Sequence, residues 1–75
     1  MMNSNESPAI INNVEIALFL RDRGIPAREA IFAAVDLANK GIALSAVRDA
    51  FTVDASTEHL DAVADALHNA ATRAA

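Results

Sequence analysis

Acidic and histidine side chains near the C-terminal end are the residues best suited to chemistry. Asp61, Asp65 and His68 follow one another at intervals of four and three residues. On a helix this spacing places them on one face, where carboxylates and an imidazole can bind a divalent ion. A solvated polar face has the same spacing, and a metal site also needs groups that orient its ligands. We therefore predict no metal site and no cofactor.

The serine residues offer no nucleophile beside a base. Only Ser56 lies near a histidine, His59, and this spacing is typical of a helix start with Ser56 as its N-cap. There is no glycine-rich phosphate loop, and the absence of cysteine excludes thiolate zinc sites and disulfides. A domain this small rarely encloses a catalytic pocket. We predict that the protein is not an enzyme and has no small-molecule substrate.

Residues 37–51 supply the main alternative, because their spacing resembles a helix-turn-helix motif around Gly41. In that interpretation a second helix enters the DNA major groove and presents Ser45 and Arg48 to the bases. The same pattern occurs in many helix–glycine–helix turns. The chain has six basic and ten acidic residues, a formal charge of −4, whereas phosphate contacts supply much of DNA-binding energy. DNA-binding transcriptional regulation therefore remains the alternative, and nucleic acid is not the expected partner.

Length and composition predict a single small helical domain. The chain has 75 residues, of which 53% are hydrophobic and many of those alanine, with only two glycines and two prolines. Alanine is the best helix former, so the composition favours helices over a sheet. A chain this short buries roughly 60% of its unfolded surface, which gives marginal stability. Without disulfides or a metal, association is the remaining source of stability.

Helix start and stop signals divide the chain into four helices and a tail. The predicted helices cover about residues 8–23, 26–40, 45–51 and 56–72. Ser7, Ser45 and Ser56 (or Asp54) are the expected N-caps, and the two Gly-Ile pairs at 24–25 and 41–42 predict Schellman-type helix ends. The fold class is therefore all-α, a small bundle of four helices with the third short. Residues 1–7 are predicted to form a flexible tail and 8–75 a single helical domain.

The first helix has apolar residues on two opposite sides. Ile10, Ile11, Val14, Ala17 and Leu18 form one stripe, and Ile16, Phe19 and Leu20 point the other way. Such a helix is either sandwiched in a core or covered by another chain. Phe32 likewise lies on the polar side of the second helix. We predict that Ile16, Phe19, Leu20 and Phe32 form a dimer or partner interface; the alternative is that the first helix is central and these residues fill the core.

The other two long helices have simpler apolar patterns. The second presents a broad face of mostly small residues, namely Ala27, Ala30, Ile31, Ala34, Val35, Leu37 and Ala38. The fourth carries a stripe at near-heptad spacing, formed by Leu60, Val63, Ala64, Leu67 and Ala71. The stripe on the fourth helix is predicted to be core or a coiled-coil seam.

Charge is unevenly distributed along the chain. Arg21, Arg23 and Arg28 bracket the first turn, whereas acidic residues crowd the C-terminal part. We predict a charged rim of these arginines that meets an acidic surface on another protein or a second copy. With no apolar run of membrane-spanning length and no signal-peptide pattern, we expect a cytoplasmic protein without a membrane partner. The predicted function is a non-enzymatic protein–protein interaction module, a small regulator, adaptor or assembly factor acting as a homodimer.

Overall fold

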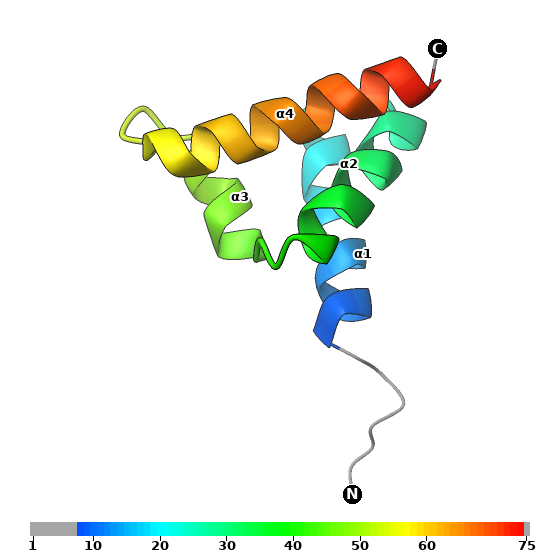
Figure 1. Cartoon of the computed structure of the whole chain (residues 1–75), viewed down its shortest axis with the longest axis horizontal. Helices are drawn as coiled ribbons and strands as arrows, with labels where there is room; N and C mark the ends of the chain where they lie inside the picture. The colour runs from blue at the N-terminus through cyan, green and yellow to red at the C-terminus, as the bar shows by residue number, and fades with distance from the viewer. Residues whose placement is uncertain (1–7, 75) are drawn as a thin grey trace, which may run out of the picture.

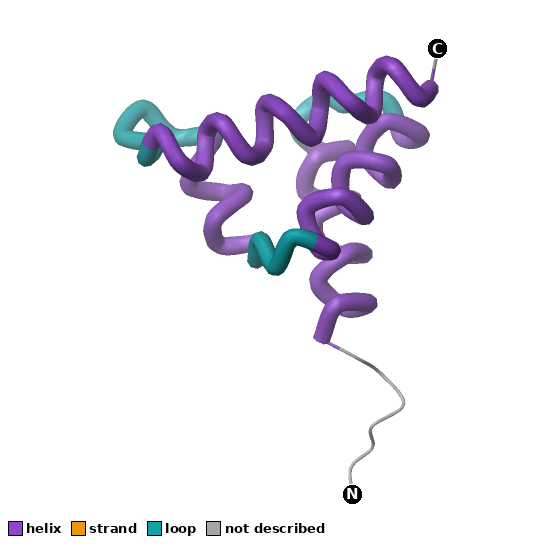
Figure 2. Tube along the Cα trace, viewed as in Figure 1, coloured by secondary structure: helices purple, strands orange, loops and turns teal. Residues whose placement is uncertain are grey.

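Four helices make up the computed structural model, which describes residues 8–74 and the side chains of residues 12–74. They are α1 (Pro8–Asp22), α2 (Ala27–Asn39), α3 (Leu44–Ala50) and α4 (Thr57–Ala74) (Figures 1 and 2). No strand occurs in residues 8–74, so the predicted all-α class with a short third helix is confirmed. The predicted tail 1–7 and the Ser7 cap lie outside the described residues.

The helix α2 is the centre of the packing. It contacts both α1 and α4, while α3 contacts α1 and α4. Figure 1 shows α4 crossing the top of the view, with α3 below its N-terminal half and α1 and α2 below its C-terminal half. Buried alanines let the helices approach closely, because they add little bulk between the backbones. These alanines are Ala30, Ala33 and Ala34 on α2 and Ala66 and Ala70 on α4.

Few large side chains fill the core between these helices. The largest fully buried ones are Ile16, Leu20, Leu37 and Val47. They come from α1, α2 and α3, and Val63 of α4 joins them. No polar or charged residue is buried among the described side chains. The core is therefore small and apolar, and it takes one face of α1.

Two glycines end α1 and α2 in the same way. Gly24 and Gly41 have φ angles of +96° and +78°. After α1, the Ile25 N–H donates to Leu20 O at 3.1 Å and the Gly24 N–H donates to Arg21 O at 3.0 Å. The corresponding bonds after α2 join Ile42 to Leu37 at 2.9 Å and Gly41 to Ala38 at 3.0 Å. Both are Schellman motifs, as predicted from the repeated Gly-Ile pairs.

The predicted N-caps have different outcomes. Ser56 Oγ accepts the His59 N–H at 3.2 Å at the start of α4, so Ser56 is the cap, not Asp54. The prediction for Ser45 is wrong, because α3 begins at Leu44 with Ala43 in the N-cap position and no side-chain bond from it. The Leu44 N–H is instead bound by a side chain from α1, which is described below.

The apolar stripe predicted for α4 is rotated relative to the core. Val63, Ala66 and Ala70 are buried, whereas Leu60 is 48% exposed and Ala64 and Ala71 are exposed. Leu67 is half-buried. α4 meets α2 through its small residues, which allow a close approach, and this leaves most of the heptad stripe outside the core.

Among the described helices, none is by itself both long and apolar enough to cross a membrane. α2 and α3 reach that length and composition only as a pair, which is bent by 119° at its break.

Candidate protein interaction surface

The two apolar sides of α1 are both present, and the structure buries the one that carries Ile16 and Leu20. Ile16 and Leu20 are fully buried, whereas Val14 is 53% and Leu18 47% exposed. α2 and α3 pack against the side of α1 that carries Ile16 and Leu20, so these two side chains cannot form a free interface. Ile16 and Leu20 therefore fill the core, as in the alternative interpretation, and the apolar side of α1 that stays exposed is the Val14–Leu18 stripe.

The two phenylalanines of the predicted interface pack partly against their own core. Phe19 and Phe32 are half-buried and contact the buried cluster. The Phe19 ring meets the Phe51 ring edge to face, with centroids 5.4 Å apart and planes at 82°. The Arg23 guanidinium lies 5.1 Å from the centre of the Phe19 ring, a cation–π distance. The Phe19–Phe51 contact thus joins α1 to the end of α3.

An apolar hollow opens between α1 and α2 beside the exposed stripe. Its volume is about 130 Å³. It is lined by Ala17, Leu18, Arg21, Ala27, Ala30 and Ile31. Ile31, which the sequence placed on the broad face of small residues of α2, is 54% exposed. We call this feature, together with Val14 one helical turn before Leu18, the α1–α2 hollow.

The α1–α2 hollow suits side chains of a protein rather than a small molecule. Pockets for small molecules usually have roughly 300 Å³ or more, and this hollow is smaller. Its walls are aliphatic apart from Arg21, which supplies a positive charge. Large exposed aliphatic side chains gathered on one surface mark interaction sites. The arrangement can therefore accept one or two apolar side chains beside an acidic group.

The three predicted rim arginines lie at different distances from this surface. Arg21 lines the hollow, and Arg23 is engaged with Phe19. Arg28 is exposed in the first turn of α2, one residue after Ala27 of the hollow. Of the three, only Arg21 lies in the wall of the hollow.

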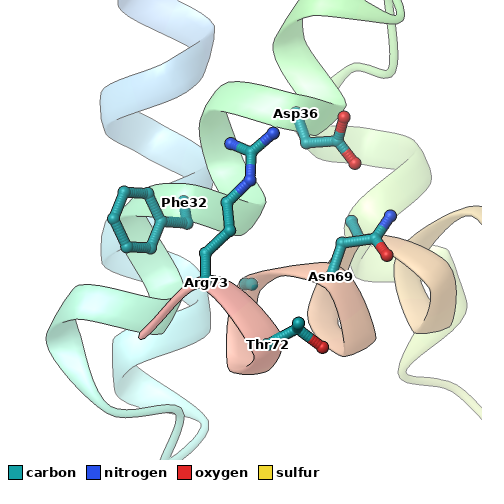
Figure 3. Close-up of a pocket in the computed structure, with 7 residues that line it drawn as sticks. Phe32, Asp36, Asn69, Thr72 and Arg73 are labelled. Carbon is teal, nitrogen blue, oxygen red and sulfur yellow. The ribbon is translucent and has the colours of Figure 1, made fainter. Parts of the chain in front are cut away.

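A second, more polar hollow of about 230 Å³ lies between α2 and the end of α4. Figure 3 shows Arg73 extending from α4 across it, with Phe32 to one side and Asn69 to the other. Asp36 Oδ2 is buried here and accepts no hydrogen bond from the described residues. It lies 3.4 Å from Lys40 Nζ, an ion pair without hydrogen-bond geometry, and Lys40 Nζ is also 3.4 Å from Asp65. The Asp36 carboxylate, followed by that of Asp65, raises the pKa of Lys40 above its ordinary value of 10.5.

Asp49, Ser56 and His59 meet where α3 leads into α4. The His59 ring Nδ1 lies 2.8 Å from Asp49 Oδ2, which also accepts the Ser56 N–H at 3.1 Å. An ionised carboxylate only accepts, so Nδ1 carries the proton and donates it. These two bonds, that of His59 first, hold the pKa of Asp49 below its ordinary value of 3.8. Ser56 Oγ binds the backbone of His59 and not its ring, so the cluster fixes the corner and lacks the geometry of a Ser-His-Asp triad.

Asn12 has a structural role that the sequence did not identify. Its Nδ2 donates to Ile42 O at 2.8 Å, and its Oδ1 accepts the Leu44 N–H at 3.1 Å. It thereby supplies the capping bond at the start of α3 that Ser45 was expected to make. Asn12-Asn13 was visible only as a possible second start for the first helix, because no local pattern signals a bond across thirty residues.

The residues that the sequence offered for metal binding lie on α4, and those that it offered for DNA contact lie on α3. Asp65 pairs with Lys40, and among the described residues no three acidic or histidine side chains are grouped to hold a metal ion. Ser45 and Arg48 are exposed on α3. α3 follows α2 after the four-residue turn 40–43, with a bend of 119°, which lies within the range of helix-turn-helix motifs.

Comparison of the chain with protein-family models, curated proteins and solved structures found no match.

Proposed function

We propose that this chain is a non-enzymatic protein–protein interaction module, a small regulator, adaptor or assembly factor that works as a homodimer. The observation that carries the proposal is the α1–α2 hollow with its three half-exposed aliphatic side chains, Val14, Leu18 and Ile31. Full burial of such a side chain contributes about 1.5–3 kcal/mol. Since each is already about half-buried, a partner that covers them gains about 1 kcal/mol from each.

The size of the chain supports association as well. A 75-residue protein with four large fully buried side chains has a small core, and such domains commonly gain stability from a partner. Covering the α1–α2 hollow would extend that core across α1. A monomer would leave the same aliphatic surface in water, at the corresponding cost in hydrophobic free energy.

Light scattering of the whole chain over a wide dilution series tests the proposal. We expect a dimer that dissociates on dilution, and Leu18→Glu or Ile31→Glu should give a monomer at every concentration. Both positions are exposed, so the helices should remain folded by circular dichroism. The matched control is Val53→Glu, because Val53 is a fully exposed aliphatic residue outside the hollow and its substitution should leave the dimer intact.

Two results would contradict this proposal. A wild-type chain that stays monomeric at the highest concentration would remove self-association. A dimer that survives both Leu18→Glu and Ile31→Glu would move the interface away from the α1–α2 hollow.

A helix-turn-helix DNA-binding regulator is the second candidate, favoured by one specific observation. The 119° bend between α2 and α3 suits that motif, and Ser45 and Arg48 are available on α3. The net charge of −4 opposes it, because DNA binding draws largely on phosphate neutralisation. Titration with mixed-sequence duplex DNA at low salt separates the two candidates. The interaction module should show no binding, whereas a DNA regulator should bind and lose affinity on Arg48→Ala.

A further inference from the structure

α4 carries an exposed apolar ridge that packs only in part against its own core. Leu60 is 48% exposed, Ala64 and Ala71 are exposed, and Leu67 is half-buried. These four residues, which we call the α4 ridge, are spaced by four, three and four positions. Such spacing forms the knobs of helix–helix packing between chains. The ridge therefore has the pattern of a helix that docks against another apolar surface.

The α4 ridge and the α1–α2 hollow have opposite charges beside them. Asp61 follows Leu60 on the solvent side of α4, and Glu58 lies one turn earlier; both are exposed. The hollow has Arg21 in its wall and the exposed Arg28 in the adjacent turn of α2. Asp65, by contrast, is already paired with Lys40 within the chain. The ridge thus has acidic neighbours, and the hollow has a basic residue in its wall, with the exposed acids Glu15 and Asp22 on the opposite flank of Leu18.

We propose that the α4 ridge of a second copy of this chain docks on the α1–α2 hollow, with Asp61 of that copy facing Arg21. The inference rests on the proposed homodimer and names which surfaces meet in it. The mode of recognition is a helix laid against an apolar groove, with Leu60 or Leu67 as the anchor. The charge pair fixes the direction and register of the docked helix, because like charges would meet in other registers.

Two such contacts can close a dimer around a twofold axis. When the ridge of each copy occupies the hollow of the other, every residue pair occurs twice. This doubles the covered area, which matters because a stable interface usually covers roughly 800 Å² on each partner. The three aliphatic side chains at the hollow are too few to supply that area alone.

A charge-swap experiment tests this pairing, with molar mass measured by sedimentation equilibrium. Arg21→Glu and Asp61→Lys should each weaken the homodimer at least tenfold, because each places like charges in both contacts. A mixture of the two single variants should form a heterodimer with the wild-type affinity. The double variant Arg21→Glu/Asp61→Lys should regain the homodimer. The matched controls are Arg48→Glu and Asp54→Lys, exposed charges elsewhere on the chain, and neither should change the affinity.

The outcomes separate this inference from the proposed function. If the wild-type chain dimerises and loses the dimer on Leu18→Glu, while Asp61→Lys has no effect, the hollow is an interface but the α4 ridge is not its occupant. If the mixed or double variants fail to recover affinity, the Arg21–Asp61 pairing is overturned. A wild-type chain that never dimerises overturns both the inference and the homodimer.

Discussion

Asn12 ties α1 to the turn between α2 and α3. Its amide donates to Ile42 O and accepts from the Leu44 N–H, at 2.8 and 3.1 Å. The Leu44 N–H is one of the donors that a helix start leaves without an intrahelical partner. A single side chain therefore satisfies a helix end and fixes the position of α3 relative to α1.

Removing the Asn12 amide should be more costly than removing the Ser45 hydroxyl. Asn12→Ala leaves a backbone donor and acceptor without partners, and we expect a loss of about 1–2 kcal/mol in the free energy of unfolding. Ser45→Ala should change it by less than about 0.5 kcal/mol, because the residue is exposed inside α3. Urea denaturation of both variants measures this, and equal losses would mean that the bonds of Asn12 contribute no more to stability than the Ser45 hydroxyl.

The Asp49–His59 contact should make stability depend on acidic pH. Because folding lowers the pKa of Asp49 below 3.8, the ionised group stabilises the fold above that value, and the stabilisation is lost as the pH falls through the folded-state pKa. The melting temperature of the wild type should exceed that of Asp49→Asn at about pH 6. The difference should shrink as the pH falls below 3.8.

A second substitution checks the cause of this pH dependence. In a His59→Ala background, Asp49→Asn should have a smaller effect, since the first partner of the carboxylate is gone. An undiminished effect would mean that His59 does not contribute to the low pKa of Asp49.

At the scale of the elements, α2 is defined by its small residues and by its ends. Its alanines let α1 and α4 approach from two sides, and Gly41 ends it in the left-handed region at φ +78°. A Cβ added at Gly41 would meet no atom within 4 Å. The requirement for glycine there is therefore conformational and not one of space.

Substitution of Gly41 should show this conformational cost directly. Gly41→Ala should lower the free energy of unfolding by about 1–2 kcal/mol, the penalty of a left-handed backbone for a residue with a Cβ. Gly41→Asn should cost less, because asparagine tolerates this region. Gly24, at φ +96° with equally open space, should follow the same order. If the alanine and asparagine variants have equal free energies of unfolding at both sites, measured by urea denaturation, backbone strain is not the reason for glycine at these helix ends.

At the scale of the whole molecule, α1 divides its apolar residues between the core and the surface. Leu20 is fully buried, and Leu18, two positions earlier, is 47% exposed. In a chain of this length the total stability is only about 5–10 kcal/mol. Because only Leu20 lies in the core, truncating the two leucines should change the free energy of unfolding by very different amounts.

Leu20→Ala should cost about 3 kcal/mol in the free energy of unfolding, because it leaves a cavity between α1 and α2. Leu18→Ala should cost less than about 1 kcal/mol when measured at concentrations where the chain is monomeric. At higher concentrations Leu18→Ala should weaken the dimer instead. Chemical denaturation at two protein concentrations separates these effects, and a larger loss for Leu18 in the monomer would place it in the core.

Local signals in the sequence determined the four helices, the ends of α1 and α2 and the start of α4. The alanine content, the Gly-Ile pairs and Ser56 act within a few residues of themselves, so a single stretch of chain shows their effect. The two-sided apolar pattern of α1 was equally visible. These features predicted the all-α fold and the presence of a surplus apolar face.

Tertiary structure alone decided which apolar face is used. Ile16 with Leu20 and Val14 with Leu18 are equally hydrophobic, and only the position of α2 and α3 buries the first pair. The same holds for α4, where close packing of alanines turns Leu60 outward. Asn12 likewise finds its backbone partners across thirty residues of sequence. Periodicity shows that a helix has a face to bury, but the direction of burial depends on where the neighbouring helices lie.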